Sequence, residues 1–309
     1  MISSLNHVLA DGSADSLLAQ VRVRLIYLWR HKRLPDLVAA PRFTEMVQRR
    51  KLHDRDPRQV PLMDKIASKS MANDLLGPEW VTPTLWQDVI LPDDMPFRTP
   101  AILKARHGCN QFAVLRDKAS ASEWNALQGR TARWMAGPYG KWLDEWAYEG
   151  VPRALIAEPL LGDGRSLPLD YKIYVFGGRA THVQVHLERA TCHRWILHDR
   201  AFRPLVAAAD LPTAPASLSA MLAAAETLGQ GHEFIRVDFF EIEGAPRFGE
   251  FCLYPGSGLD PFAADWIDLE LGSLWHAARG ETIAPDACKQ SDADRPRMII
   301  TPVGSPACS

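Results

Sequence analysis

The chain has 309 residues and a formal net charge of −2 at pH 7, so no strong overall field favours a nucleic-acid partner. Its length supports one large domain or two to three small ones. The five cysteines are scattered without a C-x-x-C pair, which argues against a disulfide framework or a cysteine-rich zinc site and favours a cytoplasmic protein. We find no apolar run long enough to cross a bilayer and no signal-peptide pattern at the N-terminus.

The N-terminal region predicts a helix followed by a basic segment. Apolar residues recur at helical spacing between residues 16 and 28, namely Leu17, Leu18, Val21, Leu25 and Leu28. The segment continues into Trp29 and the basic run 30–33, which could dock on an anionic membrane surface. A solvated helix face is the more common explanation and is preferred. The charge-dense stretch 49–60 ends at Pro61, where we place a boundary.

The next part of the chain predicts a helix and a short hairpin. The helix runs from Lys65 to Leu75 and ends before Gly77 and Pro78. Two apolar runs, 101–104 and 112–115, predict strands around a polar loop. Lys104 ends the first strand and is well placed to meet a phosphate group, although an exposed hairpin lysine is the alternative on local evidence.

The central region mixes helices and strands. Ser120 and Glu123 predict a capping box, and Trp124 and Trp134 in the helix that follows are expected in the core. Strands are predicted at 154–157, 171–176 and 180–187, and a helix at 218–228. Because helices and strands do not alternate regularly, the order predicts an α+β fold rather than a doubly wound parallel sheet.

A predicted hairpin in the last third of the chain sets two carboxylates against each other. If Glu243–Ala245 forms a three-residue loop, Ile242 pairs with Pro246, and Asp238 then lies opposite Glu250. Alternation gives one face that is polar and one that is apolar. The polar face carries Arg236, Asp238, Glu250 and Cys252, and the apolar face carries Ile235, Val237, Phe239, Phe251 and Leu253.

Opposed carboxylates roughly 5 Å apart are destabilising unless a cation lies between them. A divalent cation is one candidate, and oxygen-only ligands suit Mg²⁺. The alternative is a structural salt bridge from Arg236, and the spacing alone does not separate the two. The glycine-rich turn 255–258, which follows directly, favours a functional site.

Common nucleotide fingerprints are absent from the sequence: it has neither a G-x-x-x-x-G-K-[ST] loop nor a G-x-G-x-x-G after a strand. It does offer cations on strands, Lys104 and Lys172, and a carboxylate, Glu158, at the end of a buried strand. Together with Asp238 and Glu250 these groups meet the needs of Mg-ATP. Without a Walker loop, this set resembles the ATP-grasp superfamily.

Seven segments in the same order are similar to motifs of the TupA-like ATP-grasp family, which is associated with teichuronopeptide and other polysaccharide biosynthesis. They are RFTEMVQRRKLHDRDP, VPLMDKIASK, AILKARHG, ALIAEPLL, DYKIYVFGGR, FIRVDFFEIEG and FGEFCLYPGSG, and the resemblance covers about residues 42–274. It implies an ATP-grasp fold in which two α+β subdomains clasp ATP, with an N-terminal helical extension. We therefore expect a helical segment at 1–60, subdomains at 61–160 and 161–283, and an irregular tail at 284–309.

The resemblance also implies roles for single residues. Lys65 would open the N-terminal subdomain as part of the ATP site, and Lys104 would contact the α- and β-phosphates. Glu158, with the backbone of Leu160 and Leu161, would hold adenine.

On the C-terminal subdomain, Asp170 and Lys172 would face the phosphates. Arg236 and Lys172 would act as catalytic residues on the transferring charge, and Asp238 and Glu250 would bind Mg²⁺. Two departures from the family pattern stand out. Cys109-Asn110-Gln111 replaces a run of small residues and glycines, and Cys252 lies where many ATP-grasp enzymes carry an asparagine.

By this resemblance we expect an ATP-dependent ligase that joins a carboxylate and an amine through an acyl phosphate. Its expected substrates are an amino acid or other amine and a uronic-acid-type carboxylate, with Mg²⁺ and ATP as cofactors. The basic cluster of His186, Arg189, His193 and Arg194 could receive the anionic substrate or be solvated loop residues. The alternatives are a sugar phosphotransferase, a glycosyltransferase, or a nucleotide-binding protein without turnover. In each enzymatic case Lys104→Ala and Lys172→Ala are expected to lose turnover while the fold is kept.

Overall fold

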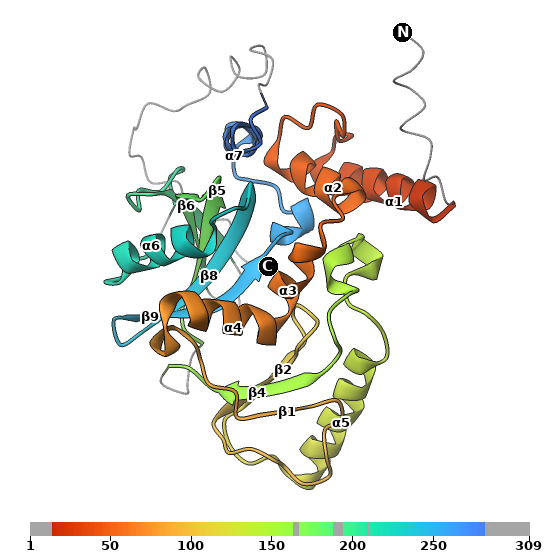
Figure 1. Ribbon diagram of the computed structural model, residues 1–309, viewed down its shortest axis with the longest axis vertical. Helices are drawn as coiled ribbons and strands as arrows, with labels where there is room; N and C mark the ends of the chain where they lie inside the picture. Colours follow the sequence, from red (N-terminus) through yellow and green to blue (C-terminus); the bar gives the residue numbers. More distant parts are fainter. Residues whose placement is uncertain (1–13, 163–166, 188–193, 209, 282–309) are drawn as a thin grey trace. The chain divides into compact units, whose positions relative to one another are not determined.

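The computed structural model describes residues 14–162, 167–187, 194–208 and 210–281 (Figure 1). Helices and two antiparallel sheets confirm the predicted α+β class. The chain divides into two compact units. The first draws its described residues from Met1–Asp56, Gly140–Trp146 and Tyr254–Arg295, and the second from Pro57–Tyr139 and Ala147–Leu253. The four-part division expected from the sequence stays a prediction. Among the described helices, none has both the length and the apolarity of a membrane span.

The first unit is helical. It contains α1 (Ala14–His31), α2 (Phe43–His53), α7 (Asp265–Ala278) and the short 3-10 turns η3 (Lys141–Leu143) and η5 (Pro255–Gly258). The sequence pattern did not predict α2, because its buried face includes charged side chains: Glu45, Arg50 and Lys51 are at most 5% exposed. The Arg50 guanidinium lies 4.3 Å from the Trp275 ring centre of α7. A cation–π contact with this ring therefore fills a position in the core where an apolar side chain would be expected.

The helix α1 was predicted, but its apolar spacing does not mark the side that packs in the core. The buried side chains are Val23, at 4% exposure, and Tyr27, at 0%. The Tyr27 hydroxyl lies 2.9 Å from Thr44 Oγ1 of α2, which fixes this face inward. The apolar residues on which the prediction rested, Leu17, Leu18, Val21, Leu25 and Leu28, are all exposed.

The turn η5 holds three consecutive residues with left-handed backbone: Gly256, Ser257 and Gly258 have φ values of 52°, 57° and 64°. Helix α2 holds this turn through its side chains. Gln48 Nε2 donates to the Ser257 and Gly258 carbonyl oxygens at 2.9 and 3.1 Å, and Lys51 Nζ donates to the Ser257 oxygen at 2.7 Å. Burial lowers the pKa of Lys51 to about 8. These three bonds stabilise a conformation that is costly for a serine.

Gly258→Ala is expected to destabilise the protein by about 2–4 kcal/mol, combining the left-handed backbone penalty with overpacking. The new methyl group would lie 2.8 Å from the Thr44 oxygen and 2.8 Å from Val47 Cβ. Gly280→Ala is the matched control, because Gly280 has a φ of +71° but open space around the added carbon. Urea denaturation should show a clearly larger loss for the Gly258 variant. Equal losses would mean that the turn relaxes freely.

The second unit contains both sheets. Its helices are η1 (Pro57–Gln59), α3 (Val60–Met63), α4 (Lys65–Leu76), η2 (Pro78–Trp80), α5 (Ala121–Met135) and α6 (Leu218–Leu228); η4 (Trp146–Tyr148) begins at the boundary between the units. The predicted helix at Lys65 is confirmed. Asp64 caps it by accepting the backbone N–H of Ile66 at 2.9 Å, and it ends before Gly77, whose φ is 103°.

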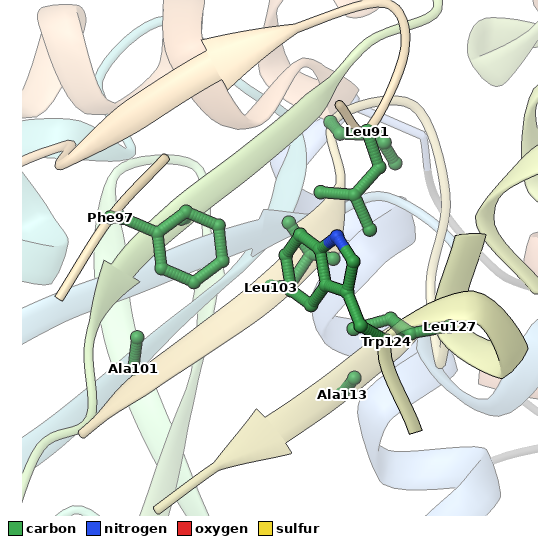
Figure 2. Packing of buried hydrophobic residues seen from close by; sticks show 9 residues of the cluster. Leu91, Phe97, Ala101, Leu103, Ala113, Trp124 and Leu127 are labelled. Carbon is green, nitrogen blue, oxygen red and sulfur yellow. The ribbon is translucent and has the colours of Figure 1, made fainter. Parts of the chain in front are cut away.

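The first sheet has four antiparallel strands in the order β1 (Trp86–Asp88), β4 (Leu155–Pro159), β2 (Ala101–Ala105) and β3 (Phe112–Leu115). Helix α5 packs against it (Figure 1). Trp124 and Leu127 of α5 meet Leu103 and Ala113 of the sheet in one buried cluster (Figure 2). The Ser120 capping box is present, and Trp134 packs partly buried at the edge of the cluster. The predicted helix start and the core position of Trp124 are therefore confirmed, whereas Trp134 is only partly buried.

The second sheet has five antiparallel strands in the order β7 (Arg194–Asp199), β6 (Arg179–Leu187), β5 (Asp170–Phe176), β8 (Phe234–Ile242) and β9 (Ala245–Cys252). Helix α6 packs against β5, β6 and β8, and its apolar residues Met221, Leu222, Ala225 and Leu228 are buried. The inner strands β5 and β8 also carry buried charged residues, namely Asp170, Lys172, Arg236 and Asp238. These residues are the polar groups of the candidate site.

The β8–β9 hairpin reaches the predicted register by a different route. The turn has two residues, Glu243 and Gly244, both with positive φ, and Ile242 pairs with Ala245 rather than with Pro246. The predicted three-residue loop is therefore wrong. A bulge at Gly249 adds the missing residue to β9, so Asp238 still pairs with Glu250. Two displacements of one residue cancel, and the predicted opposition of the two carboxylates is confirmed.

Candidate active site

A pocket in the second unit gathers most of the predicted site residues. Its lining includes side chains from α4, both sheets and the loop after β2. The predicted residues among them are Lys65, Lys104, Glu158, Leu160, Leu161, Asp170, Asp238 and Glu250. Lys172 and Arg236 lie directly behind this wall, because both donate hydrogen bonds to Asp238. Residues far apart in the sequence thus meet at one place in the fold.

Glu158, near the end of β4, is buried and receives a lysine at each carboxylate oxygen. Lys69 Nζ of α4 lies 2.7 Å from Oε1, and Lys104 Nζ of β2 lies 2.8 Å from Oε2. Burial by itself raises the pKa of Glu158, but the charges of Lys104 and Lys69 outweigh it and lower the pKa to about 2. The carboxylate is therefore ionised at neutral pH and holds both ammonium groups at the pocket wall.

Asp238 of β8 is buried between two cations. Arg236 donates through Nε to Oδ1 at 2.7 Å and through Nη2 to Oδ2 at 2.8 Å, and Lys172 Nζ donates to Oδ2 at 2.5 Å. Lys172 also pairs with Asp170 at 2.7 Å. Burial alone would raise the pKa of Asp238, but Arg236 and Lys172 lower it to about 2. The salt bridge from Arg236, one of the two readings of the sequence, is thus present.

The pKa of Lys172, the lysine in this cluster, is shifted in the opposite direction to that of Asp238. Burial alone would lower the pKa of Lys172, but the negative charges of Asp170 and Asp238 raise it. Two aspartates, one lysine and one arginine give the cluster no net formal charge. It is a neutral, preorganised set of charges at the base of the pocket.

Glu250 is the more open member of the carboxylate pair. It lies directly across from Asp238 in the ladder, and its side chain is 34% exposed. Lys65 Nζ lies 3.7 Å from Oε2 of Glu250 and donates to the Gly108 carbonyl at 2.6 Å. The first lysine of α4 therefore joins the acidic edge of β9 to the loop between β2 and β3.

The family follows from the sequence over most of its length. Residues 45–276 match the family described as TupA-like ATPgrasp. The chain belongs to the TupA-like ATP-grasp family. Its fold is accordingly the ATP-grasp fold expected from the seven motifs.

Solved structures with a resembling fold are remote in sequence. The D-alanine–D-alanine ligase from Bacillus anthracis is 13% identical, with 75% of this chain and 69% of that chain covered and a TM-score of 0.42. The L-amino acid ligase from Bacillus licheniformis is 13% identical, with coverages of 76% and 49% and a TM-score of 0.42. The ATP-grasp ligase PsnB complexed with minimal precursor is 13% identical, with coverages of 72% and 61% and a TM-score of 0.39. Among curated proteins none matches this chain.

The acidic edge of this TupA-like protein fits Mg²⁺ in its donor chemistry. Within the described residues, no three His, Cys, Asp or Glu side chains converge as ligands, but Mg²⁺ is usually held by one or two carboxylates together with phosphates and water. Glu250 is partly open to the pocket. Oδ1 of Asp238 accepts the Arg236 Nε bond, and a carboxylate oxygen has room for a second partner. Cys252 adds nothing to the set, because burial raises its pKa to about 12 and keeps the thiol protonated.

The backbone expected to hold adenine borders the same pocket. Leu160 and Leu161 both line it. The Leu160 N–H donates to the Pro100 carbonyl at 3.1 Å, so this donor is already engaged with the start of β2. The roles assigned to Leu160, Leu161 and the other site residues stay predictions.

Lys69 is a site residue that sequence reasoning missed. It lies one helical turn after Lys65 on α4, and residues four apart share a helix face. That spacing was the available signal, since both lysines line the pocket. Besides Glu158, Lys69 binds Thr84 Oγ1 at 2.8 Å. The Lys69 ammonium group thus donates two hydrogen bonds, one to Thr84 and one to Glu158.

Glu158→Gln is expected to lose stability in a pH-dependent way. The folded-state pKa of about 2 lies below the ordinary value of 4.5, so the ionised group stabilises the fold above pH 4.5, and this contribution disappears as the pH falls towards 2. Its full size is on the order of 3 kcal/mol. Urea denaturation of wild type and variant should give a difference that shrinks in acid. Glu149→Gln, at an exposed position, is the baseline; a difference for Glu158→Gln that is constant with pH would contradict the two-lysine account.

Proposed function

We propose that this protein is an ATP-dependent carboxylate–amine ligase that acts in the cytoplasm in polysaccharide or glycoconjugate biosynthesis. Membership of the TupA-like ATP-grasp family supports the use of ATP. The observation that carries the proposal is a single pocket that joins the lysine pair on Glu158 to the acidic edge at Asp238 and Glu250. Cations for phosphates and carboxylates for a metal are the two requirements of Mg-ATP.

The proposed reaction has two steps. A carboxylate oxygen of the first substrate attacks the γ-phosphorus of ATP, and the bond to the β-phosphate oxygen breaks, which gives an acyl phosphate and ADP. The nitrogen of an amine then attacks the acyl carbon, inorganic phosphate leaves, and the nitrogen loses a proton to give the amide. The first substrate is a uronic-acid-type carboxylate, and the second is an amino acid or another amine.

Different residues of the site have different roles in the proposed reaction. Lys65, Lys69 and Lys104 bind the phosphate chain, which requires that the two lysines on Glu158 turn towards the nucleotide. Lys172 and Arg236 stabilise the negative charge that develops during transfer, and because they are already fixed on Asp238 they need no reorganisation. Mg²⁺, held by Glu250 and Asp238, would neutralise charge on the phosphate oxygens.

The second sheet offers a side chain for the anionic substrate next to this site. His186 of β6 pairs in register with Asp170, so alternation puts it on the face that carries Lys172. Arg194 pairs with Leu187 instead and falls on the other face, bound to Asp210 at 3.6 Å. Arg189 and His193, the rest of the predicted basic cluster, lie outside the described residues.

Hydroxylamine trapping tests the reaction class. Enzyme, Mg-ATP and candidate uronic acids are incubated with hydroxylamine in place of the amine. A ligase is expected to give ADP and a carboxylate-dependent hydroxamate, because an acyl phosphate reacts with hydroxylamine. ADP with a phosphorylated sugar that resists hydroxylamine would replace the proposal with a phosphotransferase. Nucleotide binding without ADP formation across the whole panel would replace it with a non-catalytic binding protein.

A further inference from the structure

The outward face of α1 is a continuous apolar surface. Six large apolar side chains on it are between 38% and 66% exposed: Leu17, Leu18, Val21, Leu25, Leu28 and Trp29. At about 100° per residue these positions span an arc of about 120° on the helix, over a length of about 18 Å. The opposite side of α1 is already occupied by its packing through Val23 and Tyr27. The helix therefore has two apolar sides, and one of them faces solvent.

The charges around this face have one sign. Between residues 17 and 35 the sequence has five basic residues and no acidic one. Arg22 and Arg24 flank the apolar arc. Within the part of the chain that the structure describes, Arg22 pairs with Asp144, whereas Arg24 bonds only to Gln20 and Lys32 only to the Trp29 carbonyl. Two cations at the border of the apolar surface are thus available to an anionic partner.

A second tryptophan extends this surface. Trp142 of η3 is 72% exposed, and its ring centre lies 5.8 Å from the Arg22 guanidinium. Trp29, at 66% exposure, lies at the edge of the arc. Tryptophan combines an apolar ring with a polar N–H, and for that reason it concentrates where apolar and aqueous phases meet.

A second copy of the chain fits this face poorly. Leu18, Val21, Leu25 and Leu28 do follow the 3-4-3 spacing of a coiled-coil seam. Arg22 and Arg24 lie at the two positions beside that seam. In a parallel pair they would lie against Leu17 and Trp29, so neither arginine would gain an acidic partner, and in an antiparallel pair Arg22 would face Arg22 and Arg24 would face Arg24. Like charges there oppose pairing. The same arginines favour an acidic surface.

We propose that α1 docks the protein on an anionic lipid bilayer, lying parallel to the surface with its six apolar side chains inserted and its cations at the phosphate level. An exposed apolar arc, flanking arginines that can extend to the headgroups and tryptophans at the border are the features of an interfacial helix. The attraction between Arg24, Lys32 and the lipid phosphates makes docking sensitive to salt. This inference is independent of the proposed ligase reaction.

Vesicle flotation tests the proposal with the full chain. Wild type is expected to float with phosphatidylcholine vesicles that contain phosphatidylglycerol, less in high salt, and not with pure phosphatidylcholine. Leu18→Gln combined with Leu25→Gln should reduce the partition coefficient about a hundredfold, since each buried leucine contributes about a factor of ten. The matched control is Leu75→Gln with Leu211→Gln, two leucines of the second unit with 57% and 48% exposure, which should float like wild type.

A charge variant and a mass measurement separate the rival partners. Arg24→Glu with Lys32→Glu should remove flotation while nucleotide binding, an activity of the second unit, is kept. No flotation of wild type, or equal flotation of both leucine variants, overturns the proposal. Sedimentation that shows a dimer in wild type and a monomer in Leu18→Gln/Leu25→Gln would replace the bilayer with a second copy. Capture of an acidic helical peptide by wild type without flotation would replace it with a protein partner.

Discussion

Replacing Lys172 with methionine is expected to destabilise the protein by about 3–5 kcal/mol, because it removes the lysine from buried Asp170 and leaves buried Asp238 with the Arg236 guanidinium as its cation. The side chain of Lys172 is 4% exposed and bonds both Asp170 and Asp238. Methionine fills a similar volume, so the loss reports charge rather than a cavity. The sequence led us to expect that Lys172→Ala keeps the fold; burial of the lysine adds a stability cost to any loss of turnover.

The pH dependence of that loss has a defined window. The pKa of Lys172 is raised above 10.5, so its contribution is complete below that pH and is lost as the pH rises further. The pKa of Asp238 is lowered from 3.8 to about 2, so its contribution is complete above pH 3.8 and is lost towards 2. Urea denaturation should show the largest difference from wild type between roughly pH 4 and pH 10.

Lys104→Met is the control for this experiment. Its side chain is 25% exposed, and Glu158 keeps Lys69 when Lys104 is removed. The expected loss is on the order of 1 kcal/mol. Equal losses in the two variants would contradict the view that the cluster at Asp238 is the stabilising one.

Lys69→Ala and Lys104→Ala are each expected to weaken Mg-nucleotide binding by about ten- to a hundredfold. A charged hydrogen bond contributes about 1.5–3 kcal/mol, and each lysine is already held at the pocket wall by Glu158. Titration calorimetry with a non-hydrolysable ATP analogue measures the affinity directly. Removing one electrostatic partner should also slow ADP formation about a hundredfold or more.

Lys118→Ala is the matched control for the two binding variants, since Lys118 is an exposed lysine of the same unit and is absent from the described pocket lining. It should bind nucleotide as wild type does. Unchanged affinity in Lys69→Ala would remove Lys69 from the nucleotide site and leave it as a structural partner of Glu158. Unchanged affinity in Lys104→Ala would mean that the phosphates bind elsewhere.

Several elements of the second unit could be predicted from the sequence, because their signals are local. The helix start at Lys65 and the capping box at Ser120 each depend on a few neighbouring residues, and both features are present. The first unit was harder to predict. In α2 the charged residues Arg50 and Lys51 are buried, so the apolar residues alone do not show the helical period. The partners of these two residues, the Trp275 ring and the Ser257 carbonyl, lie more than two hundred residues away in the sequence.

The sequence also did not predict which ion-pair partner each charged side chain of the site would have. The register of β8 and β9 predicted that Asp238 and Glu250 are opposed, but not that both oxygens of Asp238 bind cations while Glu250 stays partly exposed. Lys104 was expected at phosphate, and its present partner Glu158 belongs to the adjacent strand β4. Ion pairs across strands depend on rotamers and on burial, which a residue pattern does not encode. The outward stripe of α1 shows the same limit, because periodicity identifies a helix face without saying what covers it.

The bulge at Gly249 determines which length changes this hairpin can tolerate. An insertion at the exposed turn Glu243–Gly244 lengthens a loop and leaves the ladder beyond the bulge intact. Deleting Gly249 would remove the bulge and place Glu250 directly after Phe248, so Glu250 would still lie opposite Asp238 in a regular ladder. Length variation among relatives is therefore expected at the turn and at Gly249, whereas deleting one further residue of β9 between the turn and Glu250 would place Phe251 opposite Asp238. Close contacts also keep position 249 small, since a side-chain carbon there would lie 3.1 Å from the Asp238 carbonyl oxygen and 3.1 Å from the Phe240 ring.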